Sequence, residues 1–347
     1  MKRILATLLA LMMIFALCAC GQTAAQPAAT EEPAAAEPAA EPAAEPAAEP
    51  AAEPAEVNYP TKEITLLVPF NAGGSSDIVA RLFAEHAKKY CDQPFVVVDN
   101  GGGGGVPATT EFLSYPADGY SVEYAASAPT CTQSVLSDIP YSVEDDLDYL
   151  CQVNMDDLCI VVRADCPANN MDEFVDWVKN NSLVWGASNG GVHYFASLAM
   201  MADLGISATY VPTDGGSDSV AKLLGAHVDY VTIHPSEVFS SYSNGETKII
   251  GIMSEERCEL LPDVPTLKEQ GYDYNFAVLK GFIVQPGIDP AVRAKLLEIC
   301  KSVLEDEEFI AACKDVGCYI QYKTGEEYRA MNLENYKTFK SILESAS

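Results

Sequence analysis

Residues 64–77 read ITLLVPFNAGGSSD, and this stretch sets the expectation for the whole fold. Its first part, 64–70, is an apolar, β-rich run typical of a buried strand, and a turn of small residues follows it. From 77 to 90, apolar residues recur with the spacing of one helical face. The sequence therefore predicts a strand, a glycine-rich turn and a helix in succession.

The same alternation continues along the chain. Further strands are expected at 95–99, 121–125, 158–163, 183–187, 208–211, 228–233, 249–253 and 281–285, and helices at 107–114, 171–179, 193–204, 218–224 and 291–304. Such alternation predicts an α/β fold with mostly parallel sheets flanked by helices. Two β-like stretches, 150–163 and 278–285, lack glycine-rich turns, and we interpret them as crossings between two lobes. The expected lobes are 58–155 with 284–347, and 156–283.

The first 56 residues are expected to lie outside this fold. Two basic residues and an apolar run at 4–17 are typical of a secretory signal peptide, since a bilayer span needs about 20 residues. Leu17-Cys18-Ala19-Cys20 resembles a bacterial lipobox, which predicts a signal peptide at 1–19 and lipidation of Cys20; an ordinary signal peptide cut at Ala19 or later is the alternative. Residues 20–56 repeat Ala, Glu and Pro and are expected to form a disordered linker. The predicted location is extracytoplasmic, with the lipid holding the chain to the cell membrane.

The charge balance restricts the partners. The 347 residues include 50 acidic and 21 basic side chains, a formal net charge of −29. A nucleic-acid partner is not expected, because neutralising phosphates requires clustered Lys and Arg. An anionic ligand remains compatible, since exposed charges are screened beyond about 8 Å at physiological ionic strength.

The cysteines indicate neither a zinc site nor a complete disulfide framework. Eleven are present, and nine lie beyond the leader, an odd number that cannot pair fully within one molecule. No CxxC spacing occurs and the chain has only four His, so no metal site is expected. Most of the nine are interpreted as small buried hydrophobes, with Cys151, Cys159 and Cys166 the best candidates for a bridge.

Four strand-to-helix turns are rich in small residues: 71–77, 101–105, 188–191 and 214–217. Glycine lets the backbone approach a ligand closely, and the following helix directs free N–H groups and partial positive charge at it. A carboxylate or phosphate suits that geometry. Because such turns lie at the carboxyl ends of strands in α/β sheets, together they predict a ligand site.

Two enzyme-like patterns occur in these turns. The glycines at 101–105 match a dinucleotide-binding pattern trivially, and an exported protein lacks a nicotinamide pool, so no cofactor is expected. The segment 186–190 fits GxSxG around Ser188, but a triad needs an acid and then a His later in the chain. Only His193, His227 and His234 follow, with no spacing that singles one out. We therefore expect no catalytic residue, and a serine esterase using Ser188 is the enzyme alternative.

Several short motifs occur in a fixed order. Besides 64–77, they are Ala117-Asp118-Gly119-Tyr120, Val211-Pro212 with Gly215, LLGAHVD at 223–229, and Arg257 with LPDVPTL at 261–267. In this order they resemble the extracytoplasmic solute-binding proteins of tripartite tricarboxylate transporters, also called the Bug family. Ala117 departs from the proline of the family motif.

The resemblance implies a type II periplasmic-binding-protein-like clamshell. Two lobes would close over a small solute, typically a carboxylate, and deliver it to the membrane subunits of a transporter. By this resemblance and the expected strand ends, the residues facing the cleft are Phe70, Ala72, Gly74, Ser75, Asp77, Ser127, Ala128, Ser188, Asn189, Gly190, Asp214, Gly215, His234 and Ser236. Asp77 is also expected to cap the helix behind the first loop. We expect a monomer, and a receptor for a signalling partner is the alternative to transport.

One departure bears on the ligand. Where the family tends to have Tyr-Lys, this chain has Thr213-Asp214. An anion in place of a cation weakens the case for a di- or tricarboxylate and favours an amino acid or another ligand with a positive group. His193 is interpreted as a partly buried histidine at a helix start.

Overall fold

The computed structural model describes residues 57–346, so the signal peptide, Cys20 and the linker lie outside the described residues. The first lobe is built on a six-stranded sheet. In spatial order its strands are β11 (Ile320–Thr324), β4 (Asp148–Asp157), β10 (Ala277–Val284), β3 (Ser121–Ala126), β1 (Ile64–Val68) and β2 (Phe95–Asp99). Four of the five side chains of β1 are apolar and buried, and they point to both sides of the strand, so both faces of the sheet are covered.

Helices cover both faces of this sheet. On one side lie α1 (Ser75–Ala87), α8 (Pro290–Leu304) and α9 (Glu307–Asp315), and on the other α2 (Val106–Leu113) and α10 (Gly325–Ala346). Phe83 of α1 and Phe282 of β10 meet in the first core, with ring centroids 4.7 Å apart. Three short segments follow strand ends in this lobe: η1 (Gly103–Gly105), the π-helical turn η2 (Ala128–Thr132) and α3 (Gln133–Leu136).

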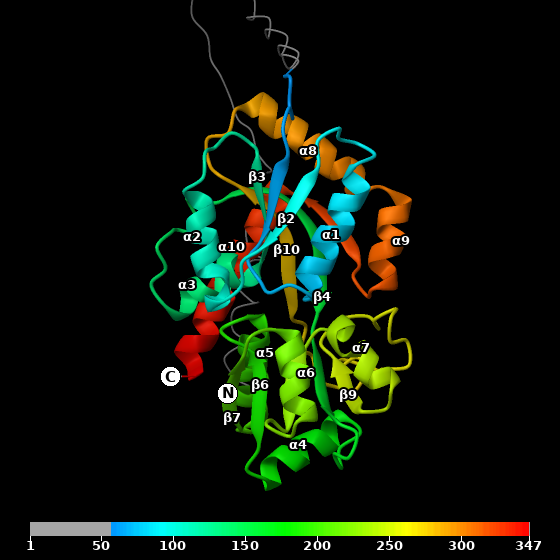
Figure 1. The fold of residues 1–347 in the computed structure, drawn as a ribbon. Helices are drawn as coiled ribbons and strands as arrows, with labels where there is room; N and C mark the ends of the chain where they lie inside the picture. Colours follow the sequence, from blue (N-terminus) through cyan, green and yellow to red (C-terminus); the bar gives the residue numbers. More distant parts are fainter. Residues whose placement is uncertain (1–56, 347) are drawn as a thin grey trace, which may run out of the picture. The chain divides into compact units, whose positions relative to one another are not determined.

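The second lobe is built on a five-stranded sheet. Its spatial order is β7 (Thr209–Thr213), β6 (Val184–Ser188), β8 (Tyr230–Ile233), β5 (Cys159–Arg163) and β9 (Thr247–Ile252). One face is covered by α4 (Met171–Asn180) and α5 (Val192–Leu204), and the other by α6 (Gly216–Leu224) and α7 (Pro235–Ser243). The expected two-lobed α/β fold is confirmed (Figure 1).

The sheets are mixed, whereas we expected mostly parallel pairing. Strand β1 pairs in parallel with β2 and β3, and β6 with β7 and β8. Strand β10 pairs antiparallel with β3 and β4, and β5 pairs antiparallel with β8 and β9. The antiparallel pairs all involve β4, β5 or β10, the strands on either side of the lobe crossings.

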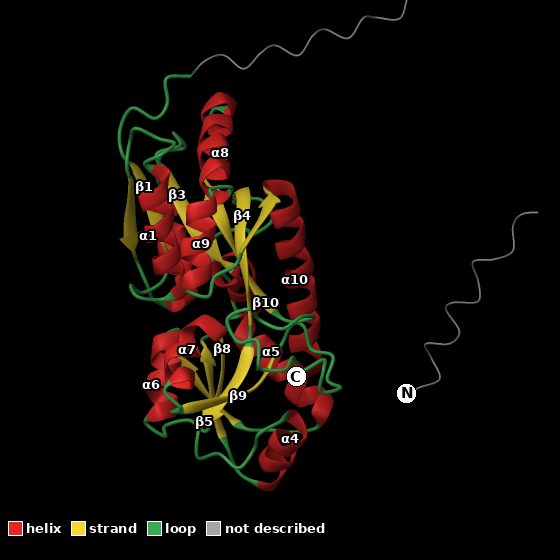
Figure 2. Ribbon diagram, turned by 90° about the vertical axis from the view of Figure 1, so that its right-hand side faces the viewer, coloured by secondary structure: helices red, strands yellow, loops and turns green. Residues whose placement is uncertain are grey.

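The chain passes twice between the two sheets by extended or irregular segments. Only Leu158 separates β4 from β5, so one extended path leads from the first sheet to the second. The return differs from the expected boundary at 283/284, because β10 pairs with β3 and β4 from Ala277 onward and belongs to the first sheet. Helix α10, not expected from sequence, is a third link, since it runs from the first lobe to the second (Figure 2). Phe339 in its second half stacks on Phe195 of α5.

The nine cysteines of the described residues are all buried and free. The bridge considered for Cys151, Cys159 and Cys166 is therefore absent, and these side chains pack as small apolar groups in three different cores. Within residues 57–346, no helix has both the length and the apolar character needed to cross a membrane.

Candidate ligand-binding site

A cavity of about 350 Å³ lies between the two lobes. The turns after β1, β2, β6 and β7 all contribute to its wall, as expected for turns at the carboxyl ends of strands. The predicted residues that line it are Phe70, Ala72, Gly74, Ser75, Ala128, Ser188, Asn189, Asp214, Gly215 and His234. The fold therefore brings together segments far apart in the chain.

Four of the predicted residues do not line this cavity. The Asp77 carboxylate accepts the N–H of Gly73 at 2.8 Å, so it fixes the loop that leads into α1. Ser127 is hydrogen-bonded to the backbone of Leu279. Gly190 faces α3, and Ser236 lies in the first turn of α7 against Gly317. These residues hold the walls in place.

Four helices begin at the cavity wall with a glycine and without a side-chain cap. The N-cap residues are Gly74 for α1, Gly105 for α2, Gly191 for α5 and Gly215 for α6. Three helices that begin away from the cavity are capped: Asn170, Asp289 and Asp306 accept first-turn N–H groups of α4, α8 and α9. The first-turn N–H groups at the cavity are thus left without a side-chain partner, which is how a helix N-terminus binds an anion.

A buried ion pair supports the wall of the first lobe. Lys280, only 2% exposed, donates from Nζ to Asp156 Oδ2 at 2.5 Å and to Ser75 Oγ at 2.7 Å. Burial opposes the charged form of both groups, but their attraction holds the pKa of Asp156 below and that of Lys280 above the usual range. Asn154 also donates to Asp156, and both charges are therefore retained inside the protein.

Two histidines face each other in the second lobe. Nε2 of His193 lies 3.2 Å from Nε2 of His234, whose Nδ1 lies 3.0 Å from the backbone oxygen of Asp157. Burial, His234 and Lys280 hold the pKa of His193 well below its usual range, so this ring is neutral. At 7% exposure and in the first turn of α5, it is more buried than the sequence suggested.

Acidic side chains also reach this part of the wall. Asp218 pairs with Lys222, whereas Asp214 and Glu237 form no ion pair within the described part of the chain. The Glu237 carboxylate lies against Gly216: a Cβ added there would come within 2.4 Å of both its oxygens. A side chain on residue 216 would collide with it, so glycine permits this approach.

Comparison with known proteins places these features in a family. The family model described as "Tripartite tricarboxylate transporter family receptor" matches residues 79–347. The chain belongs to this family. The receptor is 28% identical over 290 residues to the "UPF0065 protein in gbd 5'region" of Cupriavidus necator, an alignment covering 82% of this chain and 88% of the relative. The resemblance seen in the sequence is confirmed.

Solved structures agree with this assignment. A TctC solute-binding protein from Polaromonas is 27% identical, with a TM-score of 0.66, and the match covers 83% of the receptor and 99% of that chain. The periplasmic binding protein BugD is 25% identical, with a TM-score of 0.75 and coverage of 83% and 98%. Proteins of this family bind solutes outside the cytoplasm, and the receptor is a solute-binding protein rather than an enzyme. The esterase alternative for Ser188 falls with this finding.

The sequence did not single out several residues of the wall. Lys280 and Glu237 lie in unremarkable local contexts, and Asp156, behind Lys280, was seen only as part of a crossing strand. The sequence predicts His193 at a helix start but does not place it in the cavity. The glycine-rich turn at 101–105 is evident in the sequence, and its residues Gly103, Gly104 and Gly105 line the cavity. The glycine and serine content of the turns was the only feature of the local sequence that indicated the residues of the cavity wall.

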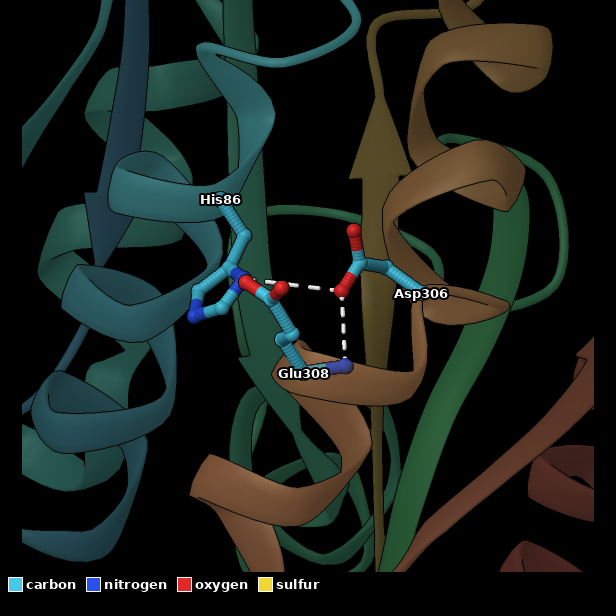
Figure 3. A group of neighbouring side chains, drawn as sticks. All are labelled: His86, Asp306 and Glu308. Carbon is cyan, nitrogen blue, oxygen red and sulfur yellow. Dashed lines mark hydrogen bonds and ion pairs between the residues drawn. The ribbon is translucent and has the colours of Figure 1, made fainter.

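A second cluster of polar side chains lies outside the cavity, where α1 meets α9 (Figure 3). His86, Asp306 and Glu308 place one ligand atom each within 4.8 Å of the others, close enough to hold a metal ion. A cation is already there, because Lys89 Nζ lies 2.9 Å from Asp306 Oδ2 and 2.8 Å from Glu308 Oε2. We interpret the group as a capped helix start that ties α9 to α1.

Proposed function

We propose that the receptor captures a small carboxylate-containing solute between its lobes and delivers it to the membrane subunits of a tripartite transporter. The observation that carries this proposal is that α1, α2 and α5 begin at the cavity with a glycine and without a side-chain cap. Their unpaired N–H groups and partial positive charges match a carboxylate without any covalent step. Membership of the receptor family supports the transport role.

Binding would be coupled to closure of the lobes. Gln133 of α3 donates from Nε2 to the backbone oxygen of Asn189 at 2.9 Å, which joins the first lobe to the second beside the cavity. A solute held by turns from both lobes favours the arrangement in which those turns are close. The closed receptor would then present a surface that the membrane subunits recognise.

We also propose that lipid on Cys20 holds the receptor at the membrane, a position outside the described residues. The lipobox-like sequence supports this, and the Ala/Glu/Pro-rich sequence that follows is typical of a spacer between an anchor and a folded domain. Cys20→Ala should move the receptor from the membrane fraction to the soluble fraction. Cys18→Ala is the matched control and should leave it at the membrane; equal fractionation of both variants and the natural chain would contradict lipidation of Cys20.

Thermal unfolding of the purified receptor with a panel of carboxylates, amino acids and aromatic acids tests the binding role. A ligand at 100 times its Kd should stabilise the folded state by about 2.7 kcal/mol. Ser75→Ala should weaken the effect, because Ser75 lies at the first turn of α1 on the cavity wall. Ser302→Ala on α8, away from the cavity, is the control. Stabilisation only by solutes without a carboxylate would overturn the proposal.

A further inference from the structure

The two lobes present different hydrogen-bonding groups to the cavity. In the first lobe, Lys280 donates to Ser75 Oγ, so the Ser75 hydroxyl hydrogen must point to another acceptor. The backbone N–H groups at the start of α1 are also donors without a side-chain cap. This wall offers donors, and the charge of Lys280 is already balanced by Asp156. The wall of the first lobe therefore has the hydrogen-bond donors to bind one carboxylate group of a ligand.

The histidine pair gives the second lobe an unpaired acceptor. The Asp157 carbonyl can only accept, so Nδ1 of His234 carries a hydrogen, and in the neutral ring its Nε2 is an acceptor. Nε2 of His193 must then donate across the 3.2 Å contact, which leaves a lone pair on His193 Nδ1. That nitrogen is buried and has no hydrogen-bond partner among the described residues.

His193 Nδ1 lies beside the turn that forms the cavity wall. A Cβ added at Gly191 would be 3.1 Å from Nδ1 and 3.4 Å from Ser188 Cβ, and all three residues line the cavity. An unsatisfied buried acceptor is unfavourable, and a ligand that brings an N–H donor to this turn would remove that penalty.

The unpaired acids lie on the same lobe. Asp214 and Glu237 form no ion pair in the described residues. Glu237 accepts the His234 backbone N–H at 3.4 Å and feels the charge of Lys280, which pairs with Asp156, and it occupies the space at the first turn of α6. A second ligand carboxylate placed there would meet two like charges and no unpaired cation. A protonated amine would be attracted by both.

We propose that the ligand is a small zwitterion, with its carboxylate at the start of α1 and Ser75 in the first lobe and its ammonium group toward His193 Nδ1, Asp214 and Glu237 in the second. This inference rests on the proposed binding of a carboxylate and narrows its class to amino acids. Asp214 and Glu237 are then the residues that select against dicarboxylates.

Calorimetric titration with matched ligands tests the inference. One set is 4-aminobutyrate, glutarate and butyrate, which share a carboxylate and differ in the other end; a second set pairs α-amino acids with the acids that lack the amino group. In every set that binds, the zwitterion should bind at least tenfold more tightly than its partners. The imidazole nitrogen spectrum of the receptor should show an unprotonated His193 Nδ1 whose resonance shifts when the zwitterion binds.

Variants that remove the charge of Asp214 or Glu237 test where the ammonium group of the ligand binds. Asp214→Asn and Glu237→Gln should each weaken zwitterion binding about tenfold. Each should also reduce the difference in affinity between the zwitterion and the dicarboxylate. Asp92→Asn, an exposed acid away from the cavity, makes the same charge change and should leave both affinities unaltered. Asp214 is exposed in a loop, so its variant should fold even if Glu237→Gln does not.

The possible results distinguish a failure of this inference from a failure of the proposed function. Tighter binding of dicarboxylates than of zwitterions would overturn the inference and leave the carboxylate receptor standing. Zwitterion binding that neither variant weakens would overturn the assignment of the amine to Asp214 and Glu237. Binding of no carboxylate at all, in a folded receptor, would remove the proposed function and this inference together.

Discussion

Two buried acids of the first sheet show how single partners decide ionisation. Asp156 has the Lys280 ammonium and the Asn154 amide beside it, and it stays charged. Glu123, fully buried on β3, receives one hydrogen bond, from Thr109 at 2.8 Å, and its Oε2 has no partner. Burial raises the pKa of Glu123 to about 8. The neutral form is therefore the native one.

Glu123→Gln should alter how stability depends on pH. Between the ordinary value of 4.5 and about 8, folded Glu123 keeps a proton that the unfolded chain has released, so this group makes the natural protein less stable as pH rises. In the glutamine variant, the free energy of unfolding lacks this contribution to the pH dependence, because glutamine does not ionise. Its advantage over the natural chain should grow by up to about 1.4 kcal/mol per pH unit in this window, measured by urea unfolding at pH 5 and 7.5. A difference that does not change with pH would contradict the assignment.

Lys280→Met should be strongly destabilising, by about 3–5 kcal/mol, because it leaves the Asp156 charge buried without its cation. Adding Asp156→Asn should recover part of this loss, since the pair is then removed together. Urea unfolding of both single variants and the double variant gives the coupling. Additive effects would show that the two side chains do not stabilise each other.

At the scale of elements, the starts of the helices divide by location. Helices α1, α2, α5 and α6 begin at the cavity with glycine N-caps, whereas α4, α8 and α9 begin away from it and are capped by Asn or Asp; α7, which begins at the cavity with His234, is the exception. A side-chain cap would satisfy the same N–H groups that a carboxylate ligand needs. Leaving α1 uncapped therefore gives up some stability of the free protein for binding.

Gly74→Asp should make the free protein more stable at the expense of ligand binding at α1. Gly74 has φ −79°, and a Cβ there would lie 3.4 Å from the nearest atom, so the side chain fits. The new carboxylate should cap α1, stabilise the free protein by up to about 1 kcal/mol and abolish carboxylate binding. Asp289→Ala at the start of α8 is the reverse control: it should cost about 1 kcal/mol and leave ligand affinity unchanged. Thermal unfolding and calorimetry measure both, and normal binding by Gly74→Asp would exclude α1 from the ligand site.

At the scale of the molecule, the turn at Gly190 in the second lobe packs against α3 of the first lobe beside the cavity. A Cβ at Gly190 would lie 2.4 Å from Leu136 Cδ1 and 2.7 Å from Gln133 Nε2, so the bare glycine lets the second lobe reach α3. The hydrogen bond from Gln133 to Asn189 depends on the same approach.

Gly190→Ala should therefore hinder closure and weaken ligand binding tenfold or more. Gly205→Ala is the matched control, because both glycines have similar positive φ, +62° and +61°, but a Cβ at Gly205 meets nothing within 4 Å. Both variants should lose similar stability from backbone strain, and only Gly190→Ala should lose affinity. Small-angle scattering should show no ligand-induced compaction for Gly190→Ala; equal affinities would contradict a role in closure.

The sequence by itself determined the repeating units of this protein. Strand, small-residue turn and helix are local properties, set by apolar spacing and by glycine, so β1, the loop to α1 and the turn at Ser188 could be predicted. The short motifs that occur in a fixed order along the chain also indicated the family. Helix α10 was missed, because a helix with many charged side chains has a weak apolar pattern, and its packing against α5 depends on the distant second lobe.

Only the tertiary structure decided the polar arrangement at the cavity. Asp156 and Lys280 are 124 residues apart, and the antiparallel register of β4 and β10 brings them together. His193 and His234 are 41 residues apart and meet because α5 and the end of β8 share one wall. No local pattern marks such partners, since their charges and hydrogen bonds are fixed by which strands pair and by the burial that pairing creates.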